Sequence, residues 1–272
     1  STGQCEFKGD CGSAWTQDAS NAGKPATHFG SGDIPFSSAD HAAISTTAPA
    51  RPFMHVPFMI GAIGVFHSVP ADDLPASTRA LNLDRCVLSG IFQRLITTWD
   101  HADILALNPG FSPPAGQPIK VVARENGSSS TTLAAKYLSD AKTDTKCRDN
   151  ARTNAAYEWK IGTGSGGPGT CSTTSGSTRK CPDWSYTAPA ASGSVVYAQG
   201  SGGVSGYLAA NPYAIAYIDS GHGHAVGASE VKVSAADGTF ISSKEADIPA
   251  AAAAAITAAA SVSASPLNPA NA

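Results

Sequence analysis

Residues 121–132, VVARENGSSSTT, carry the side chains of this chain that are best suited to hold an anion. Arg124 follows an apolar segment, and Ser128, Ser129 and Ser130 precede the amphipathic segment LAAKYLSDAK. An arginine offers two parallel N–H donors to a tetrahedral oxyanion, and the free amides at a helix N-terminus add further donors. The pattern therefore predicts an oxyanion site. The other interpretation is a surface turn in which a serine caps the helix.

The sequence carries no motif for several other chemistries. The loop has no lysine, which argues against a Walker-type nucleotide cradle. No G-x-S-x-G, H-E-x-x-H or paired-carboxylate pattern indicates catalysis. His222 and His224 lie two residues apart on a Gly-rich segment without a third ligand, which is weak evidence for a metal. We therefore expect a binding protein and not an enzyme, with no metal and no cofactor.

The composition is that of a large folded chain. It has 272 residues, of which 42% are hydrophobic and 14% charged, enough to bury a core in one large domain or two lobes. A formal net charge of −3 gives no electrostatic reason to bind nucleic acid or an anionic membrane. The sequence has no strongly apolar run of about 18 residues or more, so we expect no membrane span. The Ala-rich segment 250–260 predicts a helix. An anion site must therefore be local.

The cysteines indicate an oxidising compartment. The absence of a CxxC pair or zinc-type spacing favours three disulfide bridges, although the sequence does not determine their pairing. A bridge between Cys5 and Cys11 closes a short loop, and Cys171 pairs with Cys181 or Cys147 in this interpretation. We expect a mature chain that is extracellular or periplasmic. The six cysteines are Cys5, Cys11, Cys86, Cys147, Cys171 and Cys181.

The segments before the loop predict buried strands and a helix. Residues 53–70 are the most apolar stretch and are rich in β-forming residues, which predicts one or two buried strands. Residues 81–110 predict a helix and then a turn at Asn108-Pro109-Gly110. The helical spacing is carried by Val87, Leu88, Ile91, Phe92, Leu95 and Ile96.

The loop itself lies between a strand and a helix. Residues 119–123, IKVVA, predict the strand, and Leu133, Tyr137 and Leu138 lie on one face of the helix that follows. Residues 200–219 predict a Gly-rich turn, a short helix and a second strand. A strand, a glycine loop and a helix in this order are typical of α/β proteins.

The order of motifs resembles the phosphate-binding proteins of ABC phosphate importers, a branch of the type II periplasmic-binding-protein superfamily. THFGSGDIPFS is similar to the family segment FGASDxPL, and VPFMIGAIGVFHSVP to its interlobe strand. The stretch from LNLDRC to LNPGF matches a third family segment. VVARENGSSSTT resembles the anion loop V-x-R-x-DGSGT, and GVSGYLAANPYAIAYID resembles GV-x(5)-TPGAIGYVE. The resemblance covers roughly residues 27–240.

The resemblance implies a two-lobed α/β module with a cleft between the lobes. Lobe 1 would comprise about residues 1–60 and 225–262, and lobe 2 about residues 61–224. Residues 161–180 are of low complexity and predict a surface excursion, and residues 263–272 predict a frayed tail.

The resemblance also assigns site residues. Arg124 is the guanidinium ligand, and Ser128–Ser130 supply hydroxyl and amide donors. Asp33 accepts a hydrogen bond from a protonated phosphate oxygen, and Ser13 takes the place of the family's first-lobe serine. A carboxylate only accepts hydrogen bonds, so Asp33 favours phosphate over fully ionised sulfate. The alternative for Asp33 is an Asx turn before Pro35.

The chain departs from the family pattern in three places. Asn126 replaces the loop aspartate, and Ser129 replaces the central glycine. The family's opening strand and its C-terminal return have no counterpart, so we expect a fold that is incomplete at both termini. Exposed sheet edges are unfavourable, so a neighbouring module or subunit is expected to complete lobe 1.

The function expected from these features is extracytoplasmic binding of inorganic phosphate, with arsenate as a mimic. Hydrogen bonds and one guanidinium would hold the ligand, and closure of the lobes would follow. The competing interpretation is a structural or adhesive extracellular module that keeps the fold without the ligand and belongs to a larger assembly.

Overall fold

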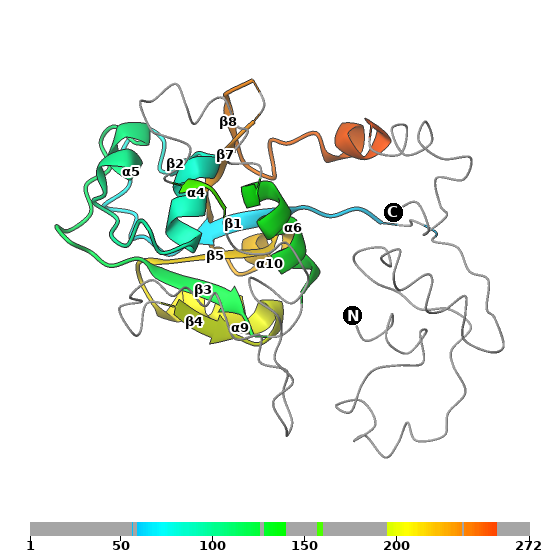
Figure 1. Cartoon of the computed structure of the whole chain (residues 1–272), viewed down its shortest axis with the longest axis horizontal. Helices are drawn as coiled ribbons and strands as arrows, with labels where there is room; N and C mark the ends of the chain where they lie inside the picture. The colour runs from blue at the N-terminus through cyan, green and yellow to red at the C-terminus, as the bar shows by residue number, and fades with distance from the viewer. Residues whose placement is uncertain are drawn as a thin grey trace, which may run out of the picture. The chain divides into compact units, whose positions relative to one another are not determined.

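The chain divides into two compact units, and nearly all of the described residues belong to the second (Figure 1). The first unit comprises Ser1–Ile60, Gly176–Thr178 and Asp247–Ala272, and the second comprises Gly61–Ser175 and Arg179–Ala246. Within the second unit, helices alternate with strands, which confirms the α/β class. The lobe boundaries and the cleft between the lobes stay predictions. The computed structural model describes residues 56, 59–125, 128–139, 157–159, 195–235 and 237–254.

A five-stranded sheet forms the centre of the second unit, in the order β4-β3-β5-β1-β6. Strands β4, β3 and β5 are parallel to one another, whereas β1 runs antiparallel to both of its neighbours. Because parallel strands run in the same direction, their carboxyl ends lie at one edge of the sheet. Such strands are joined by crossover connections. The strands are β1 (Ile63–His67), β3 (Lys120–Arg124), β4 (Val195–Ala198), β5 (Ala214–Asp219) and β6 (Ser229–Glu230).

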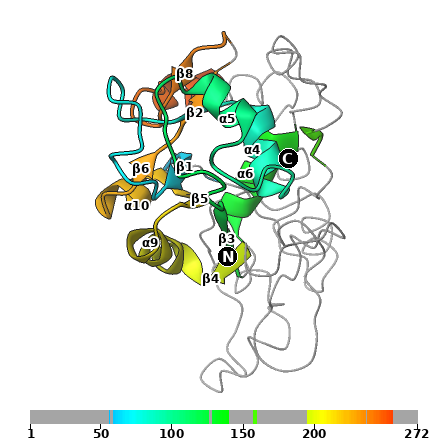
Figure 2. The same ribbon diagram turned by 90° about the vertical axis from the view of Figure 1, so that its left-hand side faces the viewer.

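Both faces of this sheet are apolar, because alternate residues of the central strands enter two separate cores. On β5, Ile215 and Tyr217 belong to one core, and Ala216 and Ile218 to the other. Helices α4 (Arg85–Phe92) and α6 (Ser129–Ser139) cover the first face. Helices α9 (Gly200–Ala210) and α10 (Ser220–Ala225) cover the second, as Figure 2 shows from the end of the sheet.

Helix α4 begins as its sequence predicts but ends earlier. Asp84 caps it by accepting a hydrogen bond from the Val87 amide at 2.8 Å. The predicted extension to Ile96 is wrong: the helix ends at Phe92, and Arg94 adopts a φ of 64°. The amides of Leu95 and Ile96 both donate to the Gly90 carbonyl. This tight turn returns Ile96 to the core and leaves Leu95 exposed.

Only part of the apolar stretch 53–70 is a buried strand among the described residues. Strand β1 pairs with β5 from Ile63 to His67, and Phe66 is fully buried. By contrast, Met59 is 82% exposed and Ile60 is 55% exposed. Hydrophobicity alone therefore overestimated the length of this strand, since burial follows the pairing with β5. Residues 53–55 and 57–58 lie outside the described part.

The remaining elements form a smaller second sheet beside helix α5 (Ala102–Leu107). The turn predicted at Asn108-Pro109-Gly110 is confirmed, since Gly110 has a φ of 88°, which favours glycine. The glycine-rich segment after residue 200 is not a separate turn, because helix α9 begins at Gly200. The order of the second sheet is β2-β7-β8, with β2 (Asn82–Leu83), β7 (Lys232–Ser234) and β8 (Phe240–Ile241).

Candidate anion site at the carboxyl edge of the sheet

The predicted anion-binding arginine lies at the carboxyl edge of the parallel strands. Strand β3 ends at Arg124, which is paired in register with Ala198 at the end of β4. Helix α6 begins at Ser129 after β3, and α9 begins at Gly200 after β4. The first turns of two helices of eleven residues each therefore follow the strand ends next to Arg124. Helix N-termini carry partial positive charge and unbonded amides, which suits this edge to an anion.

The serines of the loop form the N-terminal cap of α6. The Ser128 hydroxyl accepts a hydrogen bond from the Ser130 amide at 3.2 Å, and the Ser128 carbonyl accepts one from the Thr132 amide at 3.1 Å. Ser128 and Ser130 are buried, while Ser129 is partly exposed. The structure thus shows the capped turn that was one of the two interpretations of this loop. This cap occupies the Ser130 amide, so an anion at the same helix N-terminus would depend on the other donors of the loop.

The guanidinium of Arg124 points toward the start of α9. Its Nη1 atom donates to the Ser201 hydroxyl at 3.4 Å, and the side chain is partly buried. Ser201 was not singled out in the sequence, because it lies 77 residues from Arg124 along the chain. Only the pairing of β3 with β4 brings the two residues together.

A second residue that the sequence did not indicate lies directly beneath the loop. The Tyr217 hydroxyl lies 2.8 Å from the Thr131 hydroxyl in the first turn of α6. It also accepts a long hydrogen bond of 3.4 Å from the Arg124 amide. Burial raises the pKa of Tyr217, against opposing contributions from Thr131 and Arg124, so its hydroxyl stays protonated.

The other residues that the sequence singled out are two predicted ligands and two histidines. Asp33 and Ser13 lie outside the described residues, so their roles stay predictions. The ring Nε2 of His222 lies 3.1 Å from the Ser205 hydroxyl, and the ring Nε2 of His224 lies 3.0 Å from a carboxylate oxygen of Glu230. Within the described ranges, no three His, Cys, Asp or Glu side chains group as metal ligands.

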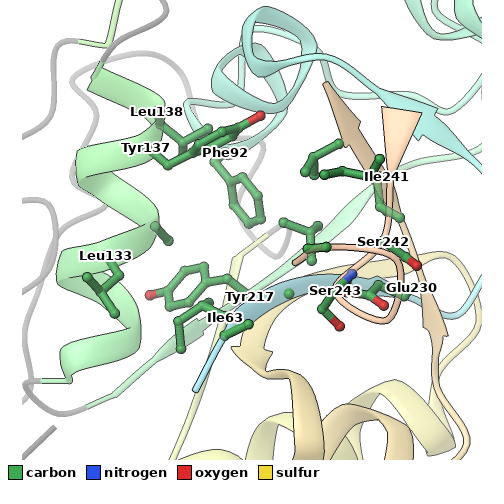
Figure 3. Close-up of a pocket in the computed structure, with 17 residues that line it drawn as sticks. Ile63, Phe92, Leu133, Tyr137, Leu138, Tyr217, Glu230, Ile241, Ser242 and Ser243 are labelled. Atoms are coloured by element: carbon green, nitrogen blue, oxygen red, sulfur yellow. Dashed lines mark hydrogen bonds between the residues drawn. The ribbon is translucent and has the colours of Figure 1, made fainter. Parts of the chain in front are cut away.

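An apolar cavity of about 290 Å³ lies beneath α6 but is distinct from the anion loop. Leu133, Tyr137 and Leu138 line it from one face of α6, as the helical spacing predicts, while Leu133 remains 42% exposed (Figure 3). Neither Arg124 nor the serines of the loop contribute to its wall. Tyr217 lines the cavity and also contacts the candidate site through its hydroxyl.

The chain belongs to the PBP superfamily, since a family model for a PBP superfamily domain matches residues 1–270. Phosphate-binding protein PstS 3 of Mycobacterium tuberculosis is 36% identical over 115 residues, which are 42% of this chain and 29% of that protein. The expected resemblance to phosphate-binding proteins is therefore confirmed. The matched segment is less than a third of the length of this relative.

Solved structures of phosphate-binding proteins share the fold. A periplasmic phosphate-binding protein, PfluDING, bound with phosphate, matches with a TM-score of 0.54 and 20% identity, covering 97% of this chain and 59% of PfluDING. A DING protein matches with the same TM-score and identity, covering 98% of this chain and 63% of that protein. At this identity the likeness shows the fold alone. No helix in the described part of the chain is long and apolar enough to cross a bilayer.

Proposed function

We propose that this chain binds inorganic phosphate at the carboxyl edge of β3. Arg124 supplies the guanidinium, and Ser128–Ser130 supply hydroxyl and amide donors other than the Ser130 amide, which donates to the Ser128 hydroxyl. The observation that carries the proposal is the position of Arg124, at a strand end immediately before the capped N-terminus of α6. A planar guanidinium and a helix N-terminus bind a tetrahedral oxyanion through complementary donors.

Asp33 and Ser13 complete the site from the first lobe in this proposal, which places the phosphate in the cleft between the lobes. The Asp33 carboxylate accepts a hydrogen bond from the protonated oxygen of hydrogen phosphate. Sulfate carries no proton and leaves the carboxylate without a donor. Arsenate has the same shape and protonation and binds as a mimic. The protein performs no reaction on the ligand, and closure of the lobes is the response to binding.

The related proteins support this ligand and an extracytoplasmic location. The mycobacterial relative is a phosphate-binding protein, and PfluDING is periplasmic and was solved with phosphate bound. A net charge of −3 does not attract anions in general, so binding depends on the local donors.

Isothermal titration of the purified chain with phosphate, arsenate and sulfate at neutral pH tests the proposal. We expect heat of binding for phosphate and arsenate and none for sulfate. The matched variant Asp33→Asn removes the acceptor charge and should admit sulfate. A folded chain that shows neither heat nor thermal stabilisation with phosphate contradicts the proposal, because a ligand that binds only the folded state must raise its stability.

The second candidate function is a structural or adhesive extracellular module. It is favoured by the hydrogen bond from the Ser130 amide to the Ser128 hydroxyl, which satisfies part of the loop without a ligand. Asn126 and Ser129, which replace the aspartate and glycine of the family loop, favour it as well. In that case the chain folds normally and the titration shows no binding of any of the three anions.

A further inference from the structure

The hydroxyl of Tyr217 joins the two ends of the anion loop. On one side it accepts a hydrogen bond from the amide of Arg124, the last residue of β3. On the other side it lies 2.8 Å from the hydroxyl of Thr131, in the first turn of α6. These contacts span 93 and 86 residues along the chain. One buried hydroxyl therefore connects the strand that carries the guanidinium to the helix that carries the serine donors.

The surroundings of the Tyr217 ring make these hydrogen bonds important for its position. The ring contacts Phe92, with 5.8 Å between the ring centroids, and is 1% exposed. It also borders the apolar cavity, and its hydroxyl is directed toward α6 (Figure 3). A wall that faces a cavity lacks packing partners on that side. The hydroxyl contacts therefore restrain the ring where packing does not.

The protonation of Tyr217 suits this bridging role. Because burial raises its pKa, the hydroxyl keeps its proton and can donate one hydrogen bond while it accepts another. It accepts from the Arg124 amide, so its own proton is available for the Thr131 oxygen. Buried hydrogen bonds of this kind fix a local geometry because the alternative leaves a polar group unsatisfied.

We infer that Tyr217 is a positioning residue for the anion loop, which sets the separation between Arg124 and the first turn of α6. The inference rests on the proposed phosphate binding and adds to it a residue that does not itself contact the ligand. A loop held in its binding geometry loses less conformational entropy when the anion binds. Without the Tyr217 hydroxyl, the same donors are present but are less well ordered before binding.

The test is Tyr217→Phe, which deletes one oxygen and keeps the ring. We expect phosphate affinity, measured by titration, to fall by about three- to tenfold, because the loop loses its hydrogen bonds to the Tyr217 hydroxyl. The control is Tyr213→Phe, which deletes a tyrosine hydroxyl that donates to Asp73 at 2.7 Å. Tyr213 precedes β5 at the opposite edge of the sheet, so this variant should keep the affinity of the wild type.

A second measurement does not depend on phosphate. Hydrogen exchange of the amides of residues 128–132 should be faster in Tyr217→Phe than in both the wild type and Tyr213→Phe. A wild type that binds no phosphate defeats the proposed function, while the exchange data still decide the role of Tyr217. The inference is overturned if exchange at these amides is unchanged in Tyr217→Phe. It is also overturned if exchange rises equally in Tyr217→Phe and Tyr213→Phe.

The variant Thr131→Val provides an independent arm that leaves Tyr217 in place. It removes the Thr131 contact but keeps the hydrogen bond from the Arg124 amide to Tyr217, so we expect an increase in exchange that is no larger than in Tyr217→Phe. The double variant should be no worse than Tyr217→Phe alone, because Tyr217→Phe already removes the contact with Thr131. Fully additive effects of the two substitutions contradict a shared bridge.

Discussion

The two halves of the central sheet satisfy their polar groups in different ways. At the carboxyl edge of the parallel strands β3 and β4, Arg124 lies among hydroxyls and helix amides. On the antiparallel side, a carboxylate contacts groups of the chain itself. Glu230 of β6 lies 3.0 Å from His224 of α10 and accepts a hydrogen bond from the Ser243 amide.

This difference follows from the direction of the strands. Parallel strands require crossover helices, and those helices begin at the same edge at which the strands end. The edge therefore gathers amide donors that a carboxylate, phosphate or other anion can use. The antiparallel strands β1 and β6 bring no such helix N-terminus, and Glu230 of β6 contacts His224 and the Ser243 amide within the chain. The parallel edge is thus the part of the sheet that is suited to an external anion.

The strongest test of this contrast is the replacement of Arg124. We expect Arg124→Ala to weaken phosphate binding by about 100-fold or more, because the remaining donors then face a doubly charged ligand without a countercharge. Arg124→Lys should retain only part of the affinity, since an ammonium cannot form two parallel hydrogen bonds. Titration with phosphate measures both effects.

The control is an arginine remote from this edge. Arg79 is exposed and donates to the Ala71 carbonyl at 2.9 Å. Arg79→Ala makes the same change in net charge and should leave phosphate affinity unaltered. Equal losses in the two variants would mean that overall charge, and not the site, attracts the anion.

On the antiparallel side, His67 should control the response of stability to pH. Burial lowers the pKa of His67 from 6.5 to about 4. Its Nδ1 accepts from the Val69 amide, and among the described residues its buried Nε2 has no hydrogen-bond partner. Between pH 6.5 and 4, His67 is therefore protonated in the unfolded chain but not in the folded chain. The free energy of unfolding should therefore decrease as the pH is lowered from 6.5 to 4. The total decrease at pH 4 should be roughly 3 kcal/mol.

The variant His67→Asn isolates this contribution. Asparagine can still accept a hydrogen bond from the Val69 amide but does not titrate. Urea unfolding between neutral pH and pH 4 should show a smaller decline for His67→Asn than for the wild type. Parallel declines would show that other groups cause the pH dependence.

Sequence reasoning located the loop but missed the residues around it, for a physical reason. Arg124 and the serines lie within one short segment of the sequence, so their chemistry and the following helix could be predicted together. Ser201 and Tyr217 reach Arg124 across 77 and 93 residues, and strand pairing decides these contacts. The end of α4 was missed because the apolar periodicity continues to Ile96, where a turn at Arg94 returns the chain to the core. The spacing of apolar residues indicates which residues are buried. It does not distinguish a helix from a turn that buries the same residue.

Two glycines provide a smaller test of how closely the antiparallel side is packed. A Cβ at Gly223 in α10 would lie 2.5 Å from the ring of the fully buried Phe66. Gly223→Ala should therefore destabilise the fold by about 1–3 kcal/mol. Gly206 in α9 has no atom within 4 Å of such a Cβ, and Gly206→Ala should stabilise the helix by up to about 1 kcal/mol. Urea midpoints measure both, and a neutral Gly223→Ala would contradict close packing at Phe66.

The smallest expected effect separates the two roles of Ser128. Ser128→Ala should cost about 1 kcal/mol of stability through the lost cap, while Ser128→Gly should cost only a few tenths. Both variants lack the hydroxyl that the proposal assigns to phosphate, so both should bind phosphate about three- to tenfold more weakly. If the hydroxyl served only as a cap, affinity would follow stability, and Ser128→Gly would bind almost as well as the wild type. Glycine preserves the helix N-terminus while it removes the side chain. Comparison of the two titrations with the two unfolding curves therefore shows whether the Ser128 hydroxyl binds phosphate or only caps the helix.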